Sequence, residues 1–389
     1  MKPAEDWLNN LTLKVSYGVQ GNDNLLDSDG YSDYYPWQGL YDMTYPNGNL
    51  SGAFLTSIEN RKLKWEKNKN LNVGVEASMF NSRLSVSAEF YVKNTSDLLL
   101  LRPLPSSSGF SGYYDNIGDM RNTGLDLTLS GDIFRTDRFT WNSSLILSTF
   151  KNKITRLSDN GSDQIISGSF IQKVGEPINS FYMPKAEGVD PETGLVQYYV
   201  THTDENGVQT QELTTSYDDA TANGRQICGS RIPDFTGSFS NSFRYRNFDL
   251  SVLTTFSVGG KVYDTTYASL MNARNMGYSW SKDMLNRWQK PGDVTDVPRI
   301  QAGRNAQYDD RFLLDASYFT LKNISLGYNL PKSWLKAAGI QNLRVFATGD
   351  NLLLVSSKKG MDPQYNFQGT QDYRYAPIRT ISFGVDIKF

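Results

Sequence analysis

The residue types that most often do chemistry in proteins are almost absent from this chain. Its 389 residues include one histidine, His202, and one cysteine, Cys228. A single residue of each type excludes a His/Cys zinc site, a disulfide within the chain and a Ser-His-Asp triad on any other histidine. A lone cysteine is either a free reactive thiol or a small core residue, and the second reading is favoured for Cys228.

Acidic and glycine-rich segments give no stronger signal. Three segments have the composition of calcium loops: Asp27–Gly30 with Asp33, Ser158–Asp163, and Asp218-Asp219. None has the twelve-residue ligand spacing that closes on a glutamate, so ordinary turn chemistry is favoured. Gly259-Gly260-Lys261 lacks the spacing of a phosphate loop, and no spacing selects a carboxylate pair for glycoside hydrolysis. The sequence therefore predicts no catalytic residue, no metal site and no cofactor, and we expect that the protein is not an enzyme.

Aromatic side chains are the more promising binding residues, because they make up 13% of the chain. A loop that runs from Tyr31 to Tyr45 contains Tyr34, Tyr35, Trp37 and Tyr41. Segment 278–290, which is predicted to include a short helix, adds Trp280 and Trp288. Flat rings with polar tips stack on sugar faces or pack against a partner protein. We interpret these residues as contacts for a substrate or a lid protein, with packing inside the loops as the alternative.

The charge balance narrows the possible partners. Lys and Arg number 39 and Asp and Glu number 41, which gives a net charge of −2. Nucleic-acid binders need a clustered basic excess, so no nucleic-acid partner is expected.

Apolar residues are spread along the chain rather than gathered into long runs. The longest uninterrupted apolar runs, Leu98–Leu101 and Leu352–Val355, are far shorter than the about 20 residues of a membrane helix. Met1–Asp6 also lacks the apolar core of a secretory signal. Membrane strands remain compatible with this composition, because their apolar residues occupy alternate positions.

Alternation with a period of two dominates the chain. Leu71 to Met79 and Leu84 to Val92 each place apolar residues at every second position, with polar residues between them. Many such ladders run for about nine residues, whereas strands of soluble proteins average about five or six. Nine to eleven residues is about what a tilted strand needs to cross a bilayer. The length of the ladders therefore favours a membrane barrel.

The connections between ladders strictly alternate between short and long. About ten strands are predicted, near 11–19, 70–80, 83–93, 116–133, 139–151, 235–245, 248–258, 318–328, 343–351 and 380–389. Tight turns near 81–83, 135–138 and 246–247, and a connection at 331–341 that is predicted to contain one helical turn, alternate with long segments at 20–69, 94–115, 152–234, 259–317 and 352–379. Barrels of the outer membrane have short periplasmic turns and long outer loops. Ile165–Ile171 and Leu195–Val200, within 152–234, are candidates for two further strands.

The ladders also predict which side chains face lipid. Val73, Val75, Val86, Val252 and Val385 are expected to face hydrocarbon, and Asn72, Glu76, Glu89, Asp126 and Asp386 the lumen. The phase slips after Leu321, which predicts a β-bulge near Lys322-Asn323. Aromatic residues at the ends of ladders predict an interfacial girdle that consists of Phe80, Tyr91, Phe134, Phe139, Trp141, Tyr245 and Phe248.

Several stretches along the chain stand out as motifs: Trp7-Leu8 with Leu11–Asn22, Asn116-Ile-Gly118 with Asn122–Asp126, Gly188–Gly194, Arg287–Asp293 with Val297-Pro-Arg299, Ala316–Pro331, Asn351-Leu352 with Gly360–Pro363, and the terminal Phe389. Together they resemble the later part of SusC/RagA-type TonB-dependent outer-membrane transporters. Their order and their spread over the whole chain carry the resemblance, although Leu353 replaces the usual aromatic residue and Asp126 the usual glutamate.

The resemblance implies an all-β, antiparallel transmembrane barrel of about twenty-two strands, of which residues 1–389 form a later portion of about ten to twelve strands. It implies import of oligosaccharides or peptides, a SusD-like surface lipoprotein over the outer mouth, and energy supplied by TonB. A signal peptide, a plug domain and a TonB-contacting box are expected to precede residue 1.

The hypothesis from sequence is therefore TonB-dependent nutrient import across the outer membrane of a Gram-negative bacterium, with the barrel in contact with outer-membrane lipid. The alternative is a secreted or surface all-β carbohydrate-binding module made of soluble sandwiches, without transport activity.

Overall fold

The computed structural model describes residues 7–25, 32–48, 50–157, 163–204, 206–272, 277–301, 307–336, 339–365, 369–371 and 375–389. Residues 1–6, the acidic loop Asp27–Gly30, Tyr31 and residues 158–162 of the second acidic segment lie outside this range, so the expectations placed on them are not addressed.

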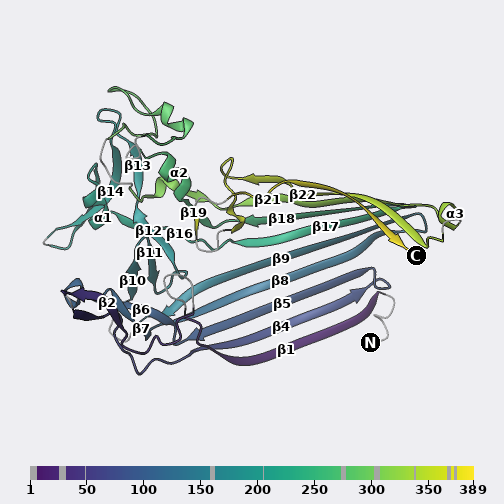
Figure 1. Ribbon diagram of the computed structural model, residues 1–389, viewed down its shortest axis with the longest axis horizontal. Coiled ribbons are helices and arrows are strands. Elements are labelled where there is room, and N and C mark those ends of the chain that lie inside the picture. Colours follow the sequence, from purple (N-terminus) through teal and green to yellow (C-terminus); the bar gives the residue numbers. More distant parts are fainter. Residues whose placement is uncertain are drawn as a thin grey trace.

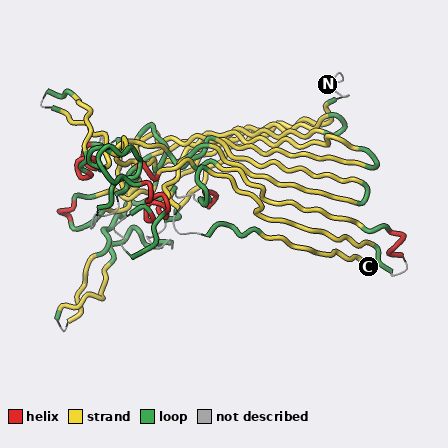
Figure 2. The backbone as a smooth tube through the Cα atoms, turned by 90° about the horizontal axis from the view of Figure 1, so that it is seen from above, coloured by secondary structure: helices red, strands yellow, loops and turns green. Residues whose placement is uncertain are grey.

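Ten long strands form one antiparallel sheet, here called the wall (Figures 1 and 2). In order across the sheet they are β1 (Leu8–Asn22), β4 (Glu66–Met79), β5 (Leu84–Ser96), β8 (Asp119–Arg135), β9 (Phe139–Arg156), β17 (Phe235–Tyr245), β18 (Phe248–Val258), β21 (Tyr318–Asn329), β22 (Asn342–Ser356) and β24 (Thr380–Lys388). Each range predicted from alternation overlaps one of these strands. Because they join into a single meander, the wall agrees with the predicted barrel portion and not with the alternative of soluble sandwiches.

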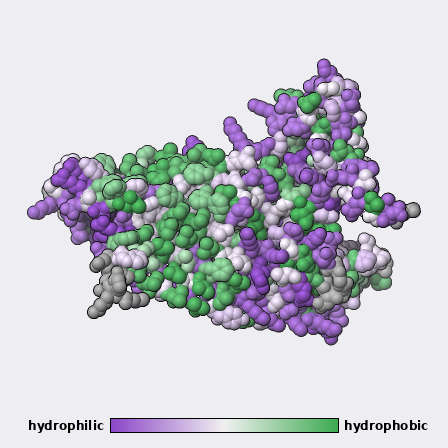
Figure 3. Space-filling model, turned by 180° about the vertical axis from the view of Figure 1, so that it is seen from behind, coloured by the Kyte–Doolittle hydropathy of each residue, from purple (hydrophilic) through white to green (hydrophobic). Residues whose placement is uncertain are grey.

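The register of the wall gathers the apolar residues on one face. Val73 pairs with Val15 on one side and with Phe90 on the other, and Val385 pairs with Val345. The neighbouring positions form the opposite, polar face, where Glu89 pairs with Asp126. Figure 3 shows the result as a broad hydrophobic area over the wall, with hydrophilic surface at both ends. The predicted assignment of side chains to the two faces is confirmed.

Connections at one end of the wall are short. Residues 80–83 join β4 to β5, and the two residues 246–247 join β17 to β18. Positive φ angles at Phe80, Asn81, Ser82 and Arg246 let the chain reverse in so few residues. The connection from β21 to β22 contains the predicted helical turn, α3 (Lys332–Leu335).

The predicted bulge is confirmed, and the two additional barrel strands are not. Opposite β18, Leu321 and Asn323 have partners and Lys322 has none. Residues 165–171 form a hairpin that turns at Gly168-Ser169, and residues 196–203 belong to another small sheet. Both lie outside the wall, because their short alternating runs pair with local neighbours rather than with a long strand.

Most of the predicted girdle lies on the apolar face near the short turns. The ring centroid of Trp141 lies 6.0 Å from that of Phe134 and 5.5 Å from that of Phe243. Tyr91 is an error in the prediction, because it pairs with Asn72 and therefore lies on the polar face. A strand end enriched in aromatic residues does not by itself show which face each ring occupies.

The long connections gather at the other end of the wall, where they form a region that we call the cap (Figure 1). It contains the sheets β10 (Gln164–Ser167)–β11 (Phe170–Lys173)–β12 (Ser180–Pro184)–β16 (Arg225–Gly229), β13 (Ala186–Val189)–β14 (Val196–Thr203)–β15 (Gln209–Thr214) and β20 (Leu313–Asp315)–β19 (Lys261–Asp264)–β23 (Thr370–Gln371). Two hairpins, β2 (Tyr41–Asn47) with β3 (Leu50–Leu55) and β6 (Leu99–Pro103) with β7 (Gly112–Asn116), complete its strands. Its helices are α1 (Tyr217–Asn223), α2 (Thr265–Leu270) and the 3-10 turns η2 (Ser106–Ser108), η3 (Lys282–Asn286), η4 (Asp310–Phe312) and η6 (Pro363–Tyr365).

Candidate functional site

The aromatic loop predicted from sequence lies in the cap, where it follows the Asn22 end of β1. Tyr34 and Trp37 line the same cleft, whose volume is about 320 Å³. Tyr35 and Tyr41 do not line it. Tyr41 begins β2, whose hairpin projects away from the rest of the cap (Figure 1). The structure therefore brings two of the four predicted loop residues together.

We name this cleft the Trp37–Trp65 cleft. It is lined by Asp23, Asn24, Leu25, Ser32, Asp33, Tyr34, Pro36, Trp37, Leu63, Lys64, Trp65 and Leu99. Sequence reasoning missed Trp65. Its position directly before β4 marks it as a residue at the end of a loop, but nothing local shows that it lies beside Trp37.

Trp65 is both supported and accessible. A Cβ atom at Gly21 would lie 2.9 Å from the six-membered ring of Trp65, so the ring rests on bare backbone that only glycine provides. The side chain is nevertheless 64% exposed. An aromatic ring that is packed on one side and open on the other can serve as a binding platform.

The backbone around the cleft is fixed by side-chain amides. The Asn116 side chain accepts a hydrogen bond from the backbone N–H of Lys64 (2.6 Å) and donates one to its carbonyl (2.7 Å). Asn60 donates its backbone N–H to the carbonyl of Trp37 at 3.0 Å. Both rings are therefore presented from anchored backbone, and Asn116 is part of the Asn-Ile-Gly stretch that carries the family resemblance.

Trp280 and Trp288 lie elsewhere in the cap and line neither of the two cavities described in this section. The indole N–H of Trp288 donates to the carbonyl of Pro191 at 2.8 Å, and its ring covers Gly194. Trp280 packs against Met284 and Val297. The short helix expected between these tryptophans is present as η3. The contacts of both rings favour packing within the loops, which was the alternative reading from sequence.

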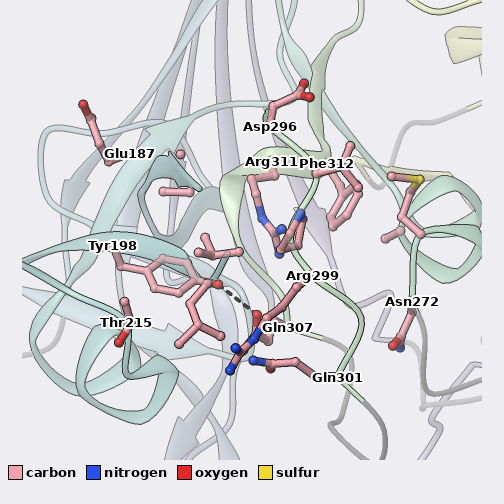
Figure 4. A pocket seen from close by; sticks show the side chains of 18 of the residues that line it. Glu187, Tyr198, Thr215, Asn272, Asp296, Arg299, Gln301, Gln307, Arg311 and Phe312 are labelled. Atoms are coloured by element: carbon pink, nitrogen blue, oxygen red, sulfur yellow. Dashed lines mark hydrogen bonds between the residues drawn. The ribbon is translucent and has the colours of Figure 1, made fainter. Parts of the chain in front are cut away.

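A second cavity, of about 380 Å³, was not predicted (Figure 4). Residues of β13, β14 and α2 line it together with segments 296–301 and 307–312. In Figure 4 the side chains of Arg299, Gln301 and Gln307 lie close together, and that of Arg311 lies beside Phe312. No local motif in the sequence predicts this cavity, because the segments that line it are separated by more than a hundred residues.

A buried ion pair holds part of the lining of this second cavity in place. Asp309 is fully buried, and its carboxylate accepts hydrogen bonds from the Arg311 guanidinium (2.7 Å) and the Tyr198 hydroxyl (2.9 Å). Burial, and then the negative charge of Asp309, raises the pKa of Tyr198, so the phenol stays protonated and acts as a donor. Gln307 lies 3.0 Å from the same hydroxyl. The arrangement is a structural network that holds η4 against β14.

The remaining motifs of interest have structural roles. Asp218 and Asp219 occupy the first turn of α1, where the helix dipole favours negative charge. Cys228 packs against the Phe181 and Met183 cluster, and burial raises the pKa of its thiol to about 11, which fits the predicted core residue. Among the described residues, no group of three or more His, Cys, Asp or Glu side chains is placed to hold a metal ion.

Gly259 and Gly260 mark the point where the chain leaves β18 for the cap. Both have positive φ angles, 81° and 77°. A side chain at Gly259 would collide with Asp234, and a Cβ atom at Gly260 would lie 2.9 Å from the carbonyl oxygen of Arg231. The glycine pair is therefore required by the sharp junction of wall and cap, which explains it without phosphate binding.

In the part of the chain that the structure describes, no helix is long and apolar enough to cross a membrane.

The wall defines the class of this protein. Ten antiparallel strands, one continuous apolar face, short turns at one end and long connections at the other are the features of an outer-membrane β-barrel. A family profile described as "TonB dependent receptor-like, beta-barrel" matches residues 2–352, and the chain belongs to this family. It is a protein of the SusC/RagA type, located in the outer membrane of a Gram-negative bacterium, as predicted.

Individual relatives agree with this assignment. TonB-dependent receptor P3 of Formosa agariphila is 33% identical over 97% of this chain and 39% of its own length. TonB-dependent receptor SusC of Bacteroides thetaiotaomicron is 27% identical over 98% of this chain and 38% of its own. The structure of the RagAB peptide transporter matches 99% of this chain and 41% of the transporter chain, with a TM-score of 0.84 and 31% identity. The chain thus spans about two fifths of the length of these relatives, which are named as receptors and transporters.

Proposed function

We propose that this protein takes part in TonB-dependent import of large nutrients, either oligosaccharides or peptides, across the outer membrane. The observation that carries the proposal is the wall with its cap, which superposes on a RagAB peptide transporter over 99% of the chain. A wall of this kind separates lipid from a polar lumen through which a cargo can pass.

The edges of the wall support a larger barrel. Within the described residues, β1 and β24 each pair with one neighbour in the wall, so each has one open edge. In hydrocarbon an unpaired backbone N–H or C=O costs several kcal/mol, so an open edge is not viable there. We therefore propose that residues 1–389 form the later portion of a barrel of about twenty-two strands and that further strands close it. A plug and a TonB-contacting box would belong to that larger protein.

The cap supports a partner on the outer side. Long connections of outer-membrane barrels lie outside the cell, so the cap faces the medium. Its exposed aromatic residues, Tyr34, Tyr35, Trp37 and Tyr41, are suited to contact with cargo or with a SusD-like lipoprotein lid. Trp280 and Trp288 are weaker candidates for the same role, because their rings pack inside the cap.

Uptake by living cells tests the proposal. The gene would be deleted in its host, and growth on single oligosaccharides or peptide digests would be compared with that of the parent and of a tonB deletion strain. We expect one class of cargo to be lost in both mutants, and a surface lipoprotein to copurify with the tagged protein. Unchanged uptake in the tonB strain would contradict the proposal.

A further inference from the structure

We propose that the short-turn end of the wall binds the phosphate groups of anionic phospholipids, with Arg138 and Arg246 as the central contacts. The inference goes beyond the import function, because it assigns a lipid partner to the end of the wall opposite the cap. We call this surface the rim. It consists of the turn residues 80–83, 135–138, 246–247 and 330–336.

The rim carries positive charge, although the chain as a whole has a net charge of −2. In each of its four turns Lys and Arg outnumber Asp and Glu. Asp137 is the single acidic residue of the rim, and its basic residues are Arg83, Arg135, Arg138, Arg246, Lys332 and Lys336. Each Lys or Arg close to an anionic lipid surface strengthens binding by about fivefold.

Arg246 lies at the boundary between the rim and the apolar face of the wall. Its neighbour Tyr245 pairs with Phe139 and with Phe248 on that face. The guanidinium of Arg246 lies over the ring of Tyr245, 5.5 Å from its centroid, so its charge is held on the side of the wall that meets lipid. Figure 3 shows hydrophilic surface directly beside the hydrophobic area at this end. Because aromatic rings of such barrels lie at the level of the headgroups, Arg246 is placed at the depth of lipid phosphate.

Arg138 and Arg246 are held next to each other. The backbone N–H of Arg246 donates to the carbonyl of Arg138 at 2.9 Å. On the other side of this turn, the Asn247 side chain donates to the carbonyl of Asn329 at 2.9 Å. Since both arginine side chains start from hydrogen-bonded backbone, they can reach the same phosphate. A guanidinium binds two phosphate oxygens at once, which favours arginine for this contact.

The two arginines are not engaged by carboxylates. Arg135 pairs with Asp132 at 3.4 Å, but among the residues that the structure describes no carboxylate forms an ion pair with Arg138 or Arg246. A phospholipid with a net negative charge supplies that partner. In phosphatidylethanolamine an ammonium group offsets the phosphate, so this lipid should bind less tightly.

A lipid fits the rim better than a free phosphate ion does. Phe134 is 54% exposed and Phe248 50% exposed on the apolar face beside the turns. Acyl chains cover such rings when the headgroup is bound at the rim, and burial of apolar surface adds to the affinity. A free phosphate ion would leave these rings uncovered.

The test uses the full-length protein, extracted from outer membranes and delipidated in a neutral detergent. It is incubated with equal amounts of phosphatidylglycerol and phosphatidylethanolamine, and native mass spectrometry measures the ratio of the bound lipids. We expect wild type to prefer phosphatidylglycerol by at least about tenfold, and Arg138→Gln with Arg246→Gln to reduce the preference to within about threefold of unity.

A second double variant, Arg61→Gln with Lys359→Gln, is the matched control. It removes the same charge from two exposed residues of the cap, so its preference should stay within about threefold of wild type. Heat-modifiable gel migration verifies the fold of each variant. If the rim variant does not fold, the salt dependence of wild type replaces it, because added salt should weaken the preference for phosphatidylglycerol.

Several outcomes would overturn the inference: wild type binds the two lipids equally, its preference is insensitive to salt, or the rim variant keeps the preference of wild type. An equal loss in the cap variant would also overturn it, since net charge and not the rim would then select the lipid. Glycerol phosphate, which has no acyl chains, should not displace the lipid, and displacement at an equal concentration would mean that the rim binds a free anion. None of these results affects the import function, which fails separately if uptake does not need TonB.

Discussion

The wall and the cap stabilise themselves with opposite arrangements of apolar side chains. In the described part of the chain, buried apolar residues such as Phe181, Tyr198 and Val262 lie mostly in the cap. The wall is one layer, and its apolar residues are exposed: Leu13 is 68% and Phe383 83% accessible. Lipid covers the apolar side chains of the wall, whereas other protein segments cover those of the cap. The stability of the wall therefore depends on the surrounding lipid, and that of the cap depends on contacts between distant segments.

The largest effect is expected in the cap, at the buried ion pair. Arg311→Met leaves the carboxylate of Asp309 buried without its guanidinium partner, which should destabilise the cap by about 3–5 kcal/mol. Pulse proteolysis of the cap in urea measures this, and heat-modifiable migration shows whether the wall is intact. We expect the wall to be unchanged.

The double variant Asp309→Leu with Arg311→Met is the control. It removes both charges, so it should recover most of the lost stability. If the single and double variants are equally unstable, the cap depends on packing at these positions and not on the ion pair.

The second effect tests the wall. Val73 lies on the apolar face and Asn72, its neighbour, lies on the polar face at nearly the same depth. Val73→Arg should cost about 2–4 kcal/mol in the bilayer and Asn72→Arg little. The yield of folded protein at the cell surface measures the difference. Equal damage by the two arginines would show that the apolar face does not meet lipid.

The same contrast between wall and cap explains which parts of the structure could be predicted from the sequence. The ten wall strands were predictable because alternation is a local rule and lipid, rather than a remote segment, covers the apolar face. Asp126 and Val385 could be assigned to their faces from position alone.

The cap could not be read in this way. Tyr198 meets Asp309 across 111 residues, and Trp288 covers Gly194, so each contact joins separate loops. The exposed loop at Tyr34 and Trp37 was identified from composition, but its partner Trp65 needed the fold. From the sequence alone, Trp280 and Trp288 also appear available for binding, because no neighbouring residue in the sequence shows what their rings pack against.

The third effect lies at the junction of the two regions. Gly259 has a φ of 81°, and a side chain there would meet Asp234. Gly259→Ala should therefore destabilise the junction by about 1–3 kcal/mol. Limited proteolysis near residue 259 measures local opening, and Gly48→Ala, in the open turn of the β2–β3 hairpin, controls for backbone strain without a collision. Equal protease sensitivity of the two variants would mean that strain alone matters and that Asp234 does not restrict the junction.

The smallest effect is a pH dependence that belongs to the cap. Burial raises the pKa of Asp310 above its ordinary value of 3.8; the neighbouring Asp309 also raises it, whereas Lys185 and the backbone N–H of Ala186 act in the opposite direction. The carboxyl group of Asp310 therefore holds its proton more tightly in the native cap than in the unfolded chain. Its stabilising contribution is complete below the unfolded pKa and is lost as pH rises through the raised native pKa.

Asp310→Asn isolates this contribution, because an asparagine oxygen can still accept the N–H of Ala186, which lies 2.8 Å from Asp310, and stays neutral at every pH. We expect the two proteins to have similar cap stability below about pH 4 and the wild type to become the less stable as pH rises. Pulse proteolysis in urea at a series of pH values measures the difference in cap stability between the two proteins. The contributions of the other acidic groups are the same in both and cancel from this difference. Asp310 belongs to η4 in the cap, so the wall is the same in both proteins. Parallel stability curves for the two proteins would show that Asp310 titrates as an ordinary surface carboxylate.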